Sequence, residues 1–194
     1  SLLSAQTPIP VATVSYSADR VMETEAGVFT GRVYATPERE RSEISIGGMS
    51  TVVIIRRDLQ NGLMLMPSQK MYKELDFSEA RKQSGAAPAD VTIDIVGTDT
   101  LEGIETTKYK LVMKDGSAGG FIWFTREGIA LRMDMLTKTG KKTERMTVSL
   151  KNLQVGAQDG ALFEAPPGFS RMPDFPGMKG LGGFGGLGRK RTTN

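Results

Sequence analysis

Apolar and polar residues alternate along most of this chain. Successive side chains of a β-strand face opposite sides, so a period of two residues predicts strands with one buried face. Alternation, or an aromatic-rich run, predicts strands at 14–18, 29–33, 44–46, 63–66, 71–75, 91–95, 109–113, 121–124, 129–135 and 146–150. The β-branched run at 51–55 does not alternate, and it predicts a strand that is buried on both faces.

Short, mostly glycine-containing turns separate these segments. Parallel strands need connections of about a dozen residues or more, so we expect an antiparallel sheet built from consecutive hairpins. One short helix is expected at 77–83, where Gly85 would stop it. We expect one domain over 11–172, a flexible segment at 1–10 and a flexible, Gly-rich basic tail at 173–194. Residues 1–6 are either the end of a cleaved signal sequence or an ordinary flexible terminus.

Composition removes most routes to catalysis. The chain has no His and no Cys, which excludes Ser-His-Asp triads, imidazole metal sites and thiol chemistry. The absence of Cys also suits an oxidising compartment. Its net charge is +3, and the tail from residue 173 alone contributes 4 − 1 = +3. The preceding residues are neutral overall, which argues against nucleic-acid binding by the folded domain. No apolar run is long enough to span a membrane.

Two other patterns have alternative interpretations. The charged runs at 38–41 and 56–58 are most simply interpreted as ion pairs between strands on a solvent-exposed face. The chain also has 11 Met, most of them in predicted strands. Met side chains fill irregular gaps in a core, and they also recur on surfaces that accept varied apolar ligands.

One stretch resembles a known family. Residues 33–43 read Val-Tyr-Ala-Thr-Pro-Glu-Arg-Glu-Arg-Ser-Glu, a later strand ends in Ile55-Arg56-Arg57-Asp58, and Met66-Pro67 and Met71-Tyr72 form a hairpin. Leu162-Phe163-Glu164-Ala165-Pro166-Pro167-Gly168-Phe169 is similar to the closing segment of the same family. Over about 11–172 the chain resembles the bacterial domain of unknown function DUF4412, within the LolA/LolB-like lipoprotein-carrier superfamily.

The resemblance implies a mainly β fold: one curved antiparallel sheet forming an incompletely closed half-barrel, with a short helical lid. It also implies an exported protein that holds an acyl chain, a lipid or a lipid-bearing protein. The chain lacks the long N-terminal helix of the carriers, so a lid could come only from 77–88, and a shallow binding face is expected.

We therefore expect a non-enzymatic periplasmic binding protein without a cofactor, which holds a lipid, an acyl chain or another apolar ligand on the concave face of the half-barrel. The alternative is an envelope structural or protein-interaction module whose core is filled by its own side chains. An error of one residue in phase would reverse the two faces of each strand, so which face is inward stays open. The candidate ligand-binding residues are Ile93, Ile95, Leu111, Met113, Trp123, Leu131, Met133 and Met135.

Overall fold

The computed structural model describes residues 7–77 and 90–173, which form one 12-stranded sheet. Its strands are β1 (Tyr16–Thr24), β2 (Gly27–Ala35), β3 (Arg39–Ile46), β4 (Met49–Arg56), β5 (Asn61–Met66), β6 (Met71–Asp76), β7 (Val91–Leu101), β8 (Ile104–Met113), β9 (Ala118–Thr125), β10 (Ala130–Thr139), β11 (Lys142–Val155) and β12 (Ser170–Arg171). The short 3-10 helices η1 (Pro67–Gln69) and η3 (Gly160–Phe163) lie between strands. Apart from Phe77 and Pro173, the expected helix and tail lie outside the described residues.

The strands run in the order β12-β6-β5-β4-β3-β2-β1-β11-β10-β9-β8-β7. Neighbouring strands are antiparallel except for the two-residue pairing of β12 with β6, which is parallel. The expected antiparallel sheet is therefore confirmed. The expectation of hairpins throughout is wrong at one point, because β6 does not pair with β7. Instead β1 pairs with β11 and joins two meanders, β1–β6 and β7–β11.

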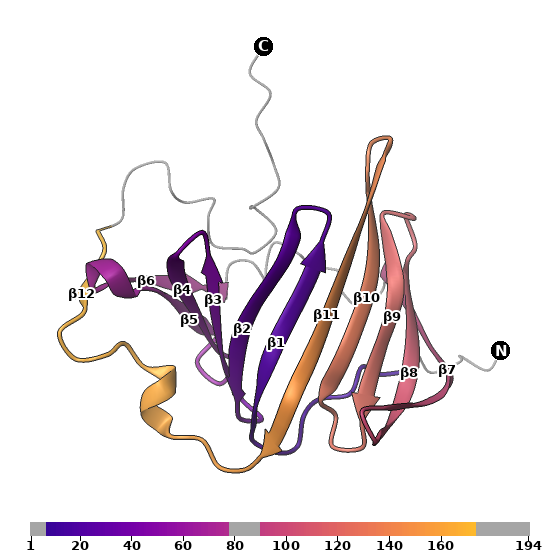
Figure 1. The fold of residues 1–194 in the computed structure, drawn as a ribbon, viewed down its shortest axis with the longest axis horizontal. Helices are drawn as coiled ribbons and strands as arrows, with labels where there is room; N and C mark the ends of the chain where they lie inside the picture. The colour runs from indigo at the N-terminus through magenta and orange to yellow at the C-terminus, as the bar shows by residue number, and fades with distance from the viewer. Residues whose placement is uncertain (1–6, 78–89, 174–194) are drawn as a thin grey trace.

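The sheet is strongly curved and open. In Figure 1 the middle strands β1 and β11 lie nearest the viewer, and both ends of the sheet recede behind them. The strand order has two separate ends, at β12 and β7, so the sheet does not close into a barrel. This confirms the expected half-barrel shape and gives the sheet a concave inner face and a convex outer face.

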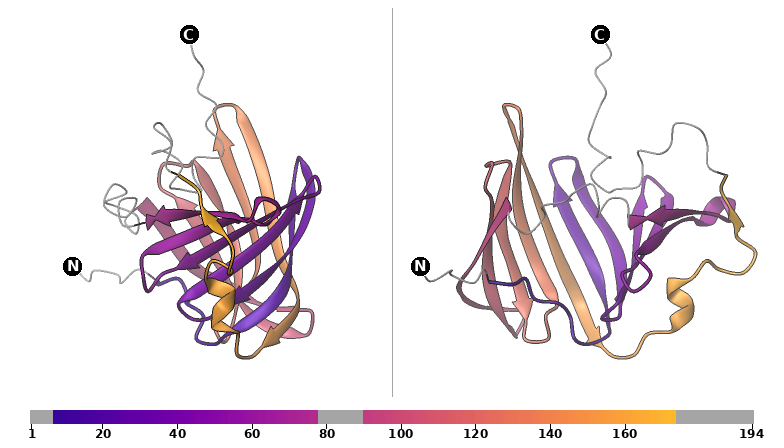
Figure 2. Two further views of the ribbon diagram at one scale, coloured as in Figure 1. Left: turned by 90° about the vertical axis from the view of Figure 1, so that its left-hand side faces the viewer. Right: turned by 180° about the vertical axis from the view of Figure 1, so that it is seen from behind.

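Cross-strand partners assign residues to the two faces, because directly opposed side chains point to the same side. Two hydrophobic clusters identify the faces. The N-terminal segment, through Ala12 and Val14, packs against Ala18 and Val33, and Figure 2 shows this segment crossing the sheet on the side seen from behind. The row of partners Ala18, Val33, Ser42, Val53, Met64 and Lys73 therefore lies on the inner face.

The outer face of β3–β5 is covered by residues 156–173, which we call the strap. The strap leaves β11, passes over β3 and β4 as η3, and ends beside β6 as β12 (Figure 2). Phe163 of η3 is 1% exposed and packs on Val52, Ile54, Leu63 and Leu65. Since Val53 on the inner side of β4 is also buried, the prediction that 51–55 is buried on both faces is confirmed.

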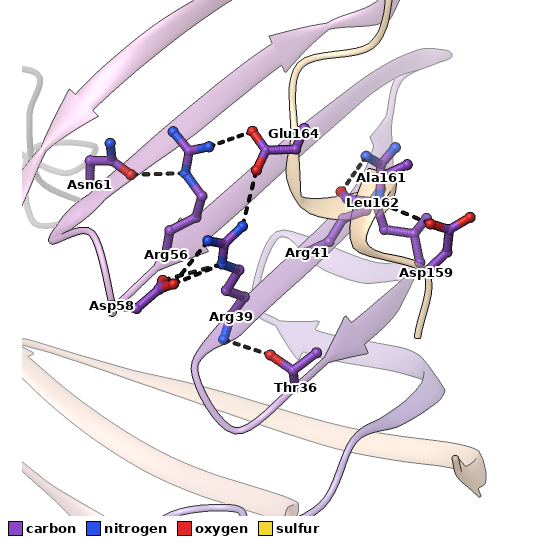
Figure 3. Close-up of polar contacts among 10 residues, drawn as sticks. All are labelled: Thr36, Arg39, Arg41, Arg56, Asp58, Asn61, Asp159, Ala161, Leu162 and Glu164. Carbon is purple, nitrogen blue, oxygen red and sulfur yellow. Dashed lines mark hydrogen bonds and ion pairs between the residues drawn. The ribbon is translucent and has the colours of Figure 1, made fainter. Parts of the chain in front are cut away.

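Three arginines attach the strap to the sheet (Figure 3). Arg56 donates to Glu164 at 2.7 Å and to Asn61 at 2.9 Å. Arg39 donates to the other Glu164 oxygen at 3.0 Å and to Asp58, while Arg41 donates to the Leu162 carbonyl at 3.0 Å. Arg56 is only 7% exposed, so placing all these charges on a solvent-exposed face was wrong for Arg56. The physical reason is the strap, which arrives from more than 100 residues later in the chain.

Replacing Phe163 tests how much the strap stabilises the fold. Phe163→Ala should lower the free energy of unfolding by about 3–5 kcal/mol, as expected for removing a fully buried aromatic ring. Urea denaturation monitored by the fluorescence of Trp123 would measure it. Phe169→Ala is the matched control, because Phe169 belongs to the strap and packs on the same cluster but is only partly buried. An equal, small effect of both variants would contradict a stabilising role for η3.

The ion pair between Arg39 and Asp58 predicts a dependence of stability on pH. The hydrogen bond from Arg39 lowers the pKa of the Asp58 carboxyl in the folded protein. Ionised Asp58 therefore stabilises the fold above its unfolded-state pKa of about 3.9, and that contribution is lost as pH falls through the folded-state pKa. Asp58→Asn should be less stable than wild type at pH 7, and the difference should shrink as the pH falls below the unfolded-state pKa of about 3.9. A difference that is the same at pH 7 and pH 3 would show that the carboxylate charge is unimportant.

Candidate functional site: the inner face of the sheet

The inner face of the second meander is apolar. Starting from Met22 on β1, the cross-strand partners across five further strands are Val148, Met133, Ile122, Tyr109 and Ile95. The next row, from β11 to β7, is Met146, Met135, Gly120, Leu111 and Ile93. These rows form a continuous apolar strip across β1 and β11–β7. Most of the side chains in them are partly buried.

The methionines in strands all lie on the inner face of the sheet, in both meanders. By register or by alternation from a paired neighbour they are Met22, Met49, Met64, Met66, Met71, Met113, Met133, Met135 and Met146. Random placement would divide them between the two faces. Except for the exposed Met49, they are partly buried. The inner face therefore carries flexible, polarizable thioether side chains along most of its width.

The structure brings seven of the eight sequence-predicted residues to one face. Ile93, Ile95, Leu111, Met113, Leu131, Met133 and Met135 occupy inner-face positions of β7, β8 and β10. Leu131 is 3% exposed and packs in the hydrophobic cluster with Ala18 and Leu150. It is therefore part of the core and is not exposed on the inner face. Ile95 is 56% exposed, and the other five are partly buried.

Trp123 lies on the opposite face, which corrects its assignment. It is the cross-strand partner of Arg132 and Lys108, one position out of phase with Ile122. The run Phe121-Ile122-Trp123-Phe124 is apolar at every position, so alternation gave no phase for β9.

On the outer face Trp123 belongs to a different group of side chains. Its indole Nε1 donates to Asp99 at 2.7 Å. The Lys108 ammonium lies 4.2 Å from the ring centroid of Phe121 and 5.1 Å from that of Trp123, and the Arg132 guanidinium also lies over the indole. Hydrogen bonding and cation–π contacts hold this ring in place without any ligand.

Sequence reasoning missed one polar group on the inner face. Arg20 of β1 donates to Ser42 of β3 at 2.8 Å and lies 3.5 Å from a Glu40 oxygen. The predicted strand ended at residue 18, whereas β1 continues to Thr24. Extending the alternation Tyr16, Ala18 by one step would have placed Arg20 on the inner face.

Tyr16 shows that this part of the inner face is poorly solvated. Burial raises the pKa of its phenol, and the nearby Glu40 carboxylate raises it further. A low local polarity strengthens electrostatic interactions of Arg20 and Glu40 relative to those in water.

The described residues give no indication of a metal site or of a membrane-spanning helix. Among residues 7–77 and 90–173, no group of three or more acidic side chains could hold a metal ion. In the same described part of the chain, no helix is long and apolar enough to cross a membrane. The chemistry that the inner face offers is burial of apolar groups beside a few polar side chains, which include Arg20 and Lys73.

Solved structures show a similar fold. An uncharacterized conserved protein from Thermus thermophilus matches with a TM-score of 0.57 and 12% identity, over 82% of this chain and 90% of that chain. MucB in the Pseudomonas aeruginosa MucA/MucB complex matches with a TM-score of 0.53 and 18% identity, over 78% of this chain. This chain spans only 58% of that one, and 55% of MucB in its complex with MucA(peri).

A LolA superfamily protein from Nitrosomonas europaea is also similar, with a TM-score of 0.42 and 10% identity, over 80% of this chain and 92% of that chain. No curated protein matches this chain.

The sequence also matches a family model over residues 22–160, which is more than half of the chain. The matched region runs from the end of β1 into η3 and so includes nearly all of the curved sheet. The chain therefore belongs to the family described as a domain of unknown function, DUF4412.

Proposed function

We propose that this protein is a non-enzymatic periplasmic binding protein that holds a lipid or another acyl chain on the inner face of its sheet. The observation that carries the proposal is the placement of the nine strand methionines on that one face. A packed core does not require such segregation on an open sheet, whereas a surface for flexible apolar ligands uses it directly.

The energetics support an acyl chain as the ligand. Burying a methylene group contributes about 0.8 kcal/mol, so about ten methylenes would contribute roughly 8 kcal/mol. Part of this is offset by the lost freedom of ligand and side chains. The free energy of binding that remains is enough to hold the chain without any catalytic or covalent step.

The chemistry of the chain supports a non-enzymatic role in the periplasm. Without His or Cys, the nucleophile and base pairs that depend on an imidazole or a thiol are missing from the whole sequence. The lack of Cys is also compatible with an oxidising compartment. We therefore favour holding or transfer of a ligand over its conversion.

A pair of neighbouring residues on β10 tests the proposal. Met135 lies on the inner face and Leu136 on the outer face, so one charge can be placed on either side of the same strand. Met135→Glu should weaken uptake of an acyl-chain fluorophore by at least about tenfold, because an ionised carboxylate opposes burial of the chain. Leu136→Glu should bind like wild type.

Native mass spectrometry of the purified protein, followed by organic extraction, would identify a ligand that co-purifies. A bound lipid that is lost in Met135→Glu and retained in Leu136→Glu is the expected result. Uptake by neither wild type nor Leu136→Glu, with no co-purifying mass, would overturn the proposal.

A second candidate function, binding of a partner protein, is favoured by the β7 end of the sheet. β7 spans 11 residues and is the last strand in the order, so among the described residues β8 is its one neighbour in the sheet. At the other end of the sheet, β6 is covered by the short strand β12. Ile95 and Val96 are both exposed there. Long edge strands can accept an extended segment of another protein as an additional strand.

Photo-crosslinking in the native cell tests this second candidate. A crosslinkable residue at Val96 should give one discrete protein adduct, while the same residue at Leu136, exposed on the outer face of β10, should not. Equal labelling from both positions, or none from Val96, would contradict docking at this edge.

A further inference from the structure

Arg20 is a cation placed beside the apolar strip of the inner face, in the row next to that of Met22 and Val148. Its cross-strand partners are Leu150 on β11 and Gly31 on β2. Along β1, its same-face neighbours are Ala18 and Met22. The side chain of Arg20 is only 22% exposed. A guanidinium in such surroundings needs partners for its donors, because burying them unpaired is unfavourable.

The Arg20 side chain crosses β2 on the inner face. The residue of β2 opposite Arg20 is Gly31, which has no side chain. The guanidinium extends past β2 and reaches Ser42 and Glu40 on β3.

The partners of Arg20 do not fully satisfy it. The 2.8 Å bond goes to the neutral Ser42 hydroxyl, whereas the Glu40 oxygen lies at 3.5 Å, beyond the usual range of charge-assisted hydrogen bonds. Arg20 Nε is buried and has no hydrogen-bond partner among residues 7–77 and 90–173. Lys73 adds a second cation to the same face, at the end of the row that contains Ser42.

We propose that Arg20 binds the anionic headgroup, a carboxylate or a phosphate, of the amphiphile whose chain occupies the inner face. This inference rests on the proposed function. With its headgroup beside the guanidinium, between β1 and β3, the ligand would extend its chain across β1 and along Val148, Met133, Ile122 and Tyr109 toward β7. The five interstrand steps from β1 to β7 correspond to about 24 Å at roughly 4.8 Å each, which gives a long acyl chain room to lie across them.

Three ligands with the same chain and different headgroups test the inference: dodecanoic acid, dodecyl phosphate and dodecanol. Their affinities can be measured by displacement of an uncharged naphthylamine fluorophore. Wild type should bind one or both anions on the order of tenfold more tightly than dodecanol. The preferred anion then distinguishes a carboxylate ligand from a phosphate ligand. Arg20→Met should abolish the preference and leave dodecanol binding within about twofold, because the aliphatic stem is retained. Arg32→Met is the matched control, since Arg32 pairs with Asp19 on the outer face.

A second variant changes the affinity in the opposite direction. Glu40→Gln removes the carboxylate that competes for Arg20, so it should bind the anions several-fold more tightly than wild type and dodecanol no differently. Equal binding of all three ligands to wild type, unchanged in Arg20→Met and Glu40→Gln, would overturn the inference and leave the acyl-chain proposal standing. Binding of none of the ligands, together with no uptake of the fluorophore, would overturn the proposed function itself.

Discussion

The pairing of β1 with β11 is the contact on which the rest of the structure depends. It joins residues more than 100 positions apart and turns two local meanders into one sheet. Its register places Met22 opposite Val148, so the inner faces of the two halves become continuous. A shift of one residue would turn one half over and separate the two apolar surfaces. The irregularity between Ser17 and Asp19 is a local adjustment of this pairing, of the kind that increases twist.

The strap determines which apolar surface is left for other molecules. It covers the outer face of the first meander, where Phe163 completes a core on β4 and β5. On the second meander the outer face is stabilised differently, by ion pairs such as Arg145 with Asp134 and by the ring contacts of Trp123. The outer face is thus partly covered and paired within the chain itself, although Val28, Val112 and Leu136 are exposed on it. The continuous apolar strip across β1 and β11–β7 lies on the inner face.

Local alternation predicted the strands and most of their hairpin pairings, but not the pairing of β1 with β11. The pattern from Ile129 to Met135 assigned the β10 side chains to the correct common face, because every second residue there is polar or exposed. The uniformly apolar β9 gave no phase, and Trp123 was misassigned. Arg20 was missed because the predicted strand ended before it, and Arg56 was interpreted as exposed because its partner Glu164 lies 108 residues later. Long-range contacts of this kind leave no local periodicity in the sequence.

In the ligand binding that we propose, an apolar face of methionines and an incompletely paired arginine would have complementary roles. Thioether and aliphatic side chains adapt to many chains and distinguish poorly among them. Selectivity therefore requires a polar group, and a polar group discriminates best where water is scarce. Arg20 meets this condition through its partial burial beside Leu150 and the poorly solvated Tyr16. The Glu40 carboxylate, 3.5 Å from the guanidinium, partly offsets its charge, so the apolar face can carry a cation without a large cost to folding.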